Sequence, residues 1–223
     1  MSKRWQIAQA LEIRWWKNYL RKKDKAVYLR DKQQYWQKVL AKMDLQLKPG
    51  ERVLDAGCGP AGIFIILDRQ KVDALDPLLD QYAEQLDHFD PSAYPWVNFE
   101  TRPLETIQVF QAYDKVFCLN VINHVADIDL CLDHLIAATV PNGYLLLAID
   151  VHNYPLMKWL FRLIPGDVLH PHQHSLTDYK AMIAQRGGQV EKQLCWKKGF
   201  LFDFWFLLIR CPQTSYSTAI DDG

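Results

Sequence analysis

The chain has 223 residues, 49% of them hydrophobic, and its 26 lysines and arginines equal its 26 aspartates and glutamates in number. This composition excludes a disordered chain, and the zero net charge argues against bulk electrostatic attraction to nucleic acid or to an anionic membrane. The five cysteines show no CxxC pair, so we expect free thiols in a reducing compartment and a cytoplasmic protein.

Residues 4–44 are predicted to be helical. Apolar and aromatic side chains recur there at roughly helical spacing, and neither proline nor glycine occurs before Pro49 and Gly50. We expect two or three helices, which would make residues 1–49 a helical extension or lid beside the rest of the chain. Charged residues interrupt each apolar stretch of the first twenty residues, so no secretory signal is expected.

The middle of the chain alternates between strand and helix patterns. Strands are predicted at residues 51–56, 71–76, 97–101, 113–120 and 144–150. Helices are predicted at residues 60–70, 77–89 and 126–140, and a turn at residues 141–143. Solidly apolar strands that alternate with helices indicate a parallel sheet covered on both faces.

The last part of the chain departs from this alternation. An insertion helix is predicted at residues 154–165, and a helix with a capping residue and terminal glycines at 175–188. Two strands close in sequence, 189–199 and 200–211, predict an antiparallel pair. The second strand is the most apolar stretch, but it is too short to span a bilayer and contains Asp203, so no membrane segment is expected. The fold class predicted is α/β: a doubly wound, mostly parallel seven-stranded sheet of the Rossmann type.

A glycine-rich turn follows the first predicted strand. Gly57, Gly59 and Gly62 satisfy the pattern G-x-G-x-x-G, which lets backbone N–H groups approach a nucleotide-type ligand. Asp55 stands two residues before Gly57, where a carboxylate would repel a pyrophosphate but attract an ammonium group. Asp76 ends the second strand and is placed to accept two hydrogen bonds from a ribose diol.

The run VLDAGCGPAG, with ALDP about twenty residues later, closely resembles class I S-adenosylmethionine-dependent methyltransferases. The segments YDKVFCLNVINHVADI and PNGYLLLAI are similar to the fourth strand with its loop and to the fifth strand of that family. The closing strand pair resembles the family's reversed hairpin. The resemblance implies an enzyme with S-adenosyl-L-methionine as cofactor and a cofactor-binding methyltransferase domain at residues 50–212. The polar composition after Pro212 predicts a flexible tail at 213–223.

The resemblance also assigns cofactor-binding residues. It places Asp55, Gly57, Cys58, Gly59 and Asn120 at the methionine part, Asp76 at the ribose, and Pro77, Leu78, Leu104 and Glu105 near the adenine. The family often has Asp-Ala-Glu where this chain has Pro103-Leu104-Glu105, and the proline removes an acceptor for the adenine amine. Three residues have structural alternatives: Asp55 as a cap of the glycine turn, Asp76 as a helix cap, and Asn120 as a turn residue.

The acceptor is expected beyond the carboxyl ends of the strands. A sulfonium methyl group is already activated, so a base is needed only when the acceptor arrives protonated. Candidate residues there are Asn123, His124, His152, Asn153, His170, His172 and His174, of which His152 and His172 are chosen as catalytic. A zinc site at HPHQH is disfavoured because alternate histidines need further ligands. Asp127, Asp129 and Asp133 are interpreted as residues of a helix start and not as a metal site.

The acceptor predicted is a small molecule methylated on oxygen, carbon or a small amine. After the fourth strand the chain reads Asn120-Val-Ile-Asn123, without the Asn/Asp-Pro-Pro-aromatic tetrapeptide of members that methylate nucleic acids and proteins. Trp15, Trp16 and Tyr19 would either line an apolar acceptor pocket or pack one face of a helix. Two alternatives remain open: a nicotinamide-dependent oxidoreductase, and a non-catalytic module that binds S-adenosylmethionine.

Overall fold

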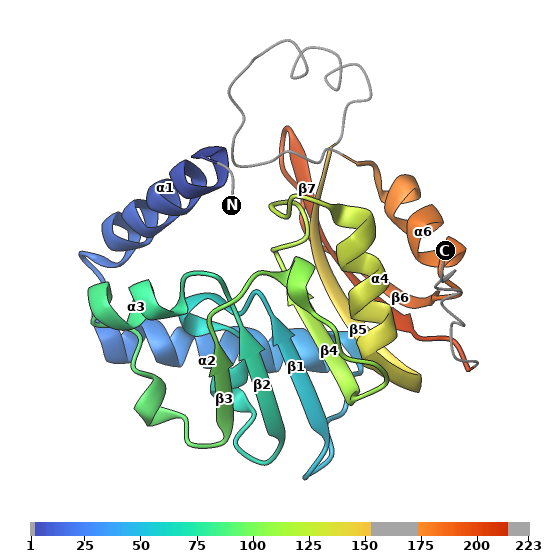
Figure 1. Cartoon of the computed structure of the whole chain (residues 1–223), viewed down its shortest axis with the longest axis horizontal. Helices are drawn as coiled ribbons and strands as arrows, with labels where there is room; N and C mark the ends of the chain where they lie inside the picture. The colour runs from blue at the N-terminus through green and yellow to red at the C-terminus, as the bar shows by residue number, and fades with distance from the viewer. Residues whose placement is uncertain (1–2, 153–173, 214–223) are drawn as a thin grey trace, which may run out of the picture.

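We analysed a computed structural model that describes residues 3–152 and 174–213 (Figure 1). Seven strands form one sheet in the order β3-β2-β1-β4-β5-β7-β6. The strands are β1 (Arg52–Ala56), β2 (Lys71–Leu75), β3 (Val97–Glu100), β4 (Tyr113–Leu119), β5 (Thr139–His152), β6 (Gln189–Lys197) and β7 (Phe202–Arg210). The first five pair in parallel, and β7 is antiparallel to both β5 and β6. The predicted fold class and closing hairpin are therefore confirmed.

Helices cover both faces of this sheet. They are α1 (Lys3–Leu20), α2 (Lys25–Met43), α3 (Leu79–Gln85), α4 (Ile128–Ala138) and α6 (Leu176–Gln185). Figure 1 shows α2 crossing one face, α4 covering the other and α1 beside α3. Two core clusters result, one containing Val53 and the other Leu54, because successive strand residues point to opposite faces.

The predicted helix at 60–70 is wrong. The structure has two short 3₁₀ helices there, η1 (Gly59–Ala61) and η2 (Ile63–Ile66). Gly62 between them is extended, with φ −69° and ψ −174°, which interrupts helical hydrogen bonding. The Phe64 N–H, which an α-helix would direct to the carbonyl of Pro60, donates instead to Asp55 Oδ2 at 3.1 Å. A carboxylate from the preceding strand thus replaces one helical hydrogen bond.

Two other boundaries also differ from the prediction. The expected turn at 141–143 lies within β5, where Thr139 pairs with Tyr113 but Tyr144 already pairs with Lys115. The turn residues form a bulge, with Asn142 at φ 60°, and the ladder continues on both sides of it. The helix expected at 77–89 is shorter, since α3 spans only Leu79–Gln85.

The remaining predicted elements agree with the structure where it describes them. Two helices occupy the N-terminal segment, and Ser175 forms a capping box with Asp178 at the start of α6. The apolar stretch before Cys211 forms β7. The expected insertion helix at 154–165 lies outside the described residues. In the described ranges, no helix combines the length and the hydrophobicity needed to cross a membrane.

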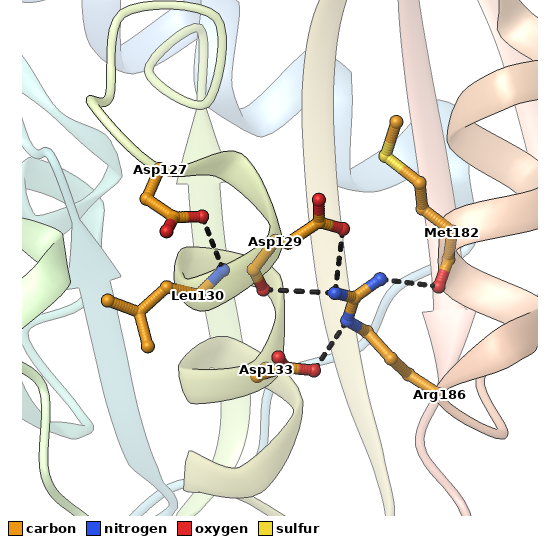
Figure 2. Close-up of polar contacts among 6 residues, drawn as sticks. All are labelled: Asp127, Asp129, Leu130, Asp133, Met182 and Arg186. Carbon is orange, nitrogen blue, oxygen red and sulfur yellow. Dashed lines mark hydrogen bonds and ion pairs between the residues drawn. The ribbon is translucent and has the colours of Figure 1, made fainter.

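The three acidic residues near α4 are structural (Figure 2). Asp127 caps the helix by accepting the Leu130 N–H at 3.0 Å. Asp129 and Asp133 accept hydrogen bonds from the Arg186 guanidinium at 2.9 and 2.6 Å, which joins α4 to the end of α6. Their interpretation as helix residues is confirmed. Among residues 3–152 and 174–213, no group of three or more His, Cys, Asp or Glu side chains is arranged to hold a metal ion.

Candidate active site

The glycine loop joins β1 to η1 at the carboxyl end of the sheet. Gly57 and Gly59 have φ values of +75° and +57°, a region that glycine adopts without strain. The N–H groups of Gly57 and Cys58 donate to the Leu75 carbonyl at 2.7 and 3.1 Å. These bonds hold the loop against the end of β2, beside Asp76.

Asp55 lies beneath the loop, with 1% of its surface exposed. Burial raises the pKa of its carboxyl to about 7, and backbone hydrogen bonds from Phe64 and Ile63 partly offset this rise. A Cβ at Gly62 would lie 2.5 Å from Asp55 Oδ2, so glycine is required there. Asp55 therefore caps the η2 segment, which follows the glycine turn whose capping was the structural alternative for Asp55 in the sequence.

Asp76 connects two turns through its two carboxyl oxygens. Oδ1 accepts the Leu78 N–H at 2.9 Å, and Oδ2 accepts the Gly59 N–H at 3.0 Å. Burial, followed by the nearby charge of Glu12, raises the pKa of this carboxyl to about 7. A carboxylate offers about four lone-pair sites, so two backbone donors leave acceptor capacity for a diol.

Helix α1 adds a carboxyl that sequence reasoning missed. The Tyr82 hydroxyl donates to Glu12 Oε1 at 3.4 Å. Burial raises the pKa of Glu12 although one side of the residue reaches solvent, and hydrogen bonds from Trp16 and Tyr82 partly offset the rise. A Cβ placed on Gly59 would lie 3.8 Å from the Trp16 ring, so α1 approaches the glycine loop closely. A single glutamate within a helical pattern gives no sequence signal, so the place of Glu12 near the glycine loop could not be predicted.

The aromatic residues of α1 differ in how deeply they pack. Trp16 packs edge-to-face on Tyr82, with ring centroids 6.2 Å apart. Trp15 and Tyr19 stack on each other at 5.0 Å and are 54% and 40% exposed. Tyr19 also packs edge-to-face on Tyr28 of α2 at 6.3 Å. Packing therefore holds for Trp16 and in part for Tyr19, and the acceptor-pocket interpretation stays a prediction.

The residues assigned to the adenine differ in exposure. Pro77 is partly exposed, whereas Leu78 and Leu104 are buried in the core clusters. The Glu105 carboxylate accepts the Ala126 N–H at 2.7 Å and so fixes the loop that precedes α4. Pro77 and Glu105 are therefore the accessible members of the four.

The loop after β4 is fixed by a buried asparagine. Asn123 Nδ2 donates to the Asp150 carbonyl at 2.9 Å, and its Oδ1 accepts the Tyr179 hydroxyl at 3.0 Å. This amide joins the ends of β4 and β5 to α6. Asn120 adopts φ 64°, as a turn residue does, and its N–H donates to the Ala148 carbonyl of β5. The exposed His124 donates its N–H to Val121 in the same loop.

The two catalytic candidates stay predictions. The backbone of His152 ends β5 and pairs with Phe202, but its side chain is outside the described part of the chain. His172 lies outside the described residues, as do Asn153 and His170. The described histidine of this stretch, His174, packs edge-to-face on Tyr179 at 5.6 Å. The zinc interpretation therefore remains untested.

The sheet order, the glycine loop after β1 and the acid after β2 define a Rossmann-like fold, a class in which ligands bind at the carboxyl ends of the strands. The family model described as "Methyltransferase domain" matches residues 28–193, and the chain belongs to this family. It is an S-adenosylmethionine-dependent methyltransferase. This family membership excludes the alternative of a nicotinamide-dependent oxidoreductase. The residues present fit this cofactor, because the buried carboxylates of Asp55 and Asp76 can accept hydrogen bonds from an ammonium group and from a ribose diol.

Curated relatives carry the same type of name. The "Ubiquinone biosynthesis O-methyltransferase" of Rhodopseudomonas palustris is 26% identical over 185 residues, which cover 72% of this chain and 70% of the relative. The protein of that name from Nitrobacter winogradskyi is 32% identical over 98 residues, covering 42% of this chain and 36% of the relative. The chain thus matches most of the first relative and about a third of the second.

Solved structures share the fold at low identity. Phosphoethanolamine N-methyltransferase 2 of Haemonchus contortus, in complex with S-adenosyl-L-methionine, matches with a TM-score of 0.61 and 13% identity over 81% of this chain and 53% of that one. The [4+2]-cyclase SpnF matches with a TM-score of 0.64 and 12% identity, over 82% of this chain and 81% of that one. Because a cyclase shares this architecture, the fold alone does not fix the reaction.

Cofactor affinity is expected to fall when the pH is lowered from 7.5 to 6. Asp55 and Asp76 have pKa values raised to about 7, and the groups that face them are Glu12, Cys58 and Tyr82, none of them cationic. Protonation removes the negative charge that would pair with the cofactor. Protonation of each carboxyl should therefore lower the affinity by about fivefold to tenfold over this pH range. Calorimetric titration with S-adenosylhomocysteine at several pH values measures the effect, and a constant affinity would contradict it.

The same raised pKa values determine how the stability of the free protein changes with pH. Since the folded carboxyls keep protons that the unfolded chain has lost, stability should decline as the pH rises from about 4 to about 7 and then level off. A cofactor that pairs with the charged carboxylates opposes this decline. The increase in melting temperature caused by S-adenosylhomocysteine should therefore grow over the same pH range.

Proposed function

We propose that this methyltransferase transfers the methyl group to an oxygen atom of a small, hydroxylated aromatic molecule. The observation that carries the proposal is that the matched relatives from Rhodopseudomonas palustris, Nitrobacter winogradskyi, Rickettsia prowazekii and Bradyrhizobium diazoefficiens are all O-methyltransferases of ubiquinone biosynthesis by name. The balanced charge of the chain agrees with a small acceptor.

The cofactor is proposed to lie across the carboxyl ends of β1, β2 and β4. Asp55 with the glycine loop, including Cys58, and Asn120 would hold its methionine part, and Asp76 its ribose. Pro77, Leu104 and Glu105 would border the adenine. When bound, the cofactor supplies an activated methyl group. Burial and the carboxyls of Asp55 and Asp76 raise the pKa of the Cys58 thiol, so Cys58 stays neutral and serves packing, not nucleophilic attack.

The acceptor is proposed to approach from the ends of β4 and β5. Asn123 fixes these ends relative to α6, which supports precise alignment of an acceptor with the methyl group. A phenolic hydroxyl has a pKa near 10 and must lose its proton to attack, so a base is useful in this reaction. His152, at the end of β5, and His172 are the candidates for that base.

The test is an acceptor screen with the purified protein and S-adenosylmethionine. Catechols and hydroxylated quinols are compared with matched anilines and with carbon acceptors, and the methylated product is located by mass spectrometry and NMR. The expected result is an O-methyl ether formed in equal amount with S-adenosylhomocysteine. Methylation confined to nitrogen or carbon acceptors would overturn the proposal.

A further inference from the structure

Three carboxyl groups from three separate elements meet at the glycine loop. Asp55 comes from β1, Asp76 follows β2, and Glu12 comes from α1. Asp76 bonds the Gly59 N–H, and Asp55 bonds the η2 backbone next to it. Glu12 Oε1 accepts the Tyr82 hydroxyl at 3.4 Å, and the charge of Glu12, like that of Asp55, raises the pKa of Asp76.

Tyr82 connects this cluster to α3. Its hydroxyl donates to Glu12, and the charges of Asp76 and Glu12 raise the pKa of Tyr82 in addition to the effect of burial. Trp16, one turn after Glu12, reaches the Gly59 backbone. Glu12 is therefore held beside the glycine loop through α3 and the loop itself, while one side of the residue stays accessible to a ligand.

Among the side chains that the structure describes, at residues 9–151 and 174–213, no lysine or arginine forms an ion pair with this cluster. The ion pairs formed there by lysine and arginine involve other acids, namely Asp44, Glu51, Glu100, Asp129, Asp133 and Glu191. Clustered carboxylates in a partly buried site repel one another, and a bound cation would relieve this repulsion. The site is thus suited to a positively charged ligand.

The methylated and demethylated forms of the cofactor differ in net charge. S-adenosylmethionine carries a sulfonium and an ammonium group against one carboxylate, so it is a net cation. S-adenosylhomocysteine has lost the sulfonium charge and is neutral overall. We propose that Glu12 is a third carboxylate of the cofactor site, and that this anionic cluster makes the protein bind S-adenosylmethionine in preference to its product. The inference rests on the cofactor site proposed above.

The experiment is a calorimetric titration at pH 7.5 and low salt with S-adenosylmethionine, S-adenosylhomocysteine and the cationic analogue sinefungin. The full chain is compared with Glu12→Gln and with the control Glu84→Gln, which makes the same charge change at an exposed position of α3. Glu12→Gln should lower the affinity for both cationic ligands by about fivefold to tenfold and change that for S-adenosylhomocysteine by less than about twofold. The control should bind all three as the unmodified chain does.

Other outcomes overturn the proposal. Unchanged affinity for the cationic ligands would remove Glu12 from the site, and equal losses for all three ligands would show a structural effect without charge selectivity. Circular dichroism and the melting temperature of the ligand-free variant check that α1 stays folded. If the unmodified chain bound none of the three ligands, the cofactor assignment itself would fail, which is a different result from a failure of Glu12.

Discussion

Asp76→Asn is expected to weaken the binding of S-adenosylmethionine by about a hundredfold, the free energy of one or two hydrogen bonds to a charged group. The carboxylate is 93% buried, since 7% of the residue is exposed, and it lies where the glycine loop meets the end of β2. Asparagine keeps the shape but removes the charge, and its amide nitrogen presents a donor where the carboxylate accepts. Calorimetric titration with the cofactor measures the loss directly.

The folded state should survive this substitution. Losing an acceptor for the Gly59 or Leu78 N–H costs about 1 kcal/mol, while removing a charge beside Glu12 offsets part of that cost. Asp73→Asn is the matched control, because Asp73 lies three residues earlier in β2 and accepts hydrogen bonds from Asn98 and Tyr113, away from the loop. An affinity for Asp76→Asn within about twofold of the original would refute the ribose role.

Gly57→Ala should destabilise the protein by about 2 to 5 kcal/mol and abolish cofactor binding. A Cβ at Gly57 would lie 2.4 Å from both Cγ atoms of Val121, a stiff β-branched side chain in the loop after β4. Overpacking of this kind costs about 1 to 3 kcal/mol, and the φ of +75° adds about 1 to 2 kcal/mol for any residue with a Cβ. Denaturant unfolding monitored by circular dichroism gives the total.

The chain offers a control that separates the two costs. Gly50 has a similar φ of +79°, but a Cβ there meets nothing within 4 Å. Gly50→Ala should therefore lose only the conformational part, about 1 to 2 kcal/mol. Adding Val121→Ala to Gly57→Ala should recover the steric part and leave the conformational part. Equal losses at Gly50 and Gly57, with no recovery by Val121→Ala, would show that the two loops are not packed as described.

Local patterns determined most of the architecture. Apolar strands between amphipathic helices predicted the five parallel strands, because burial on both faces requires that composition. Ser175 and Gly187 marked the limits of α6 through capping and a positive φ. The glycine motif and Asp76 were equally visible, since a tight turn and a strand-end acid are set by residues adjacent in sequence.

The errors arose where a distant group replaced a local one. The segment after Pro60 has a helical pattern, but the Asp55 carboxylate takes the Phe64 N–H and the extended Gly62 interrupts the helix. The turn around Asn142 remained a bulge because β4 pairs with β5 both before it, at Thr139, and after it, from Tyr144 onward. Propensity is a weak preference that such tertiary hydrogen bonds override.

The sequence by itself determined the class of sheet, the closing hairpin and the position of the glycine loop, because these depend on periodicity and on turn residues close together in the chain. Only the tertiary structure decided that Tyr82 bonds Glu12, that Asn123 bonds Tyr179, and that Arg186 pairs with the acids of α4. Each of these contacts joins elements that are far apart in sequence. Their geometry follows from how helices pack on the finished sheet, which no local pattern encodes.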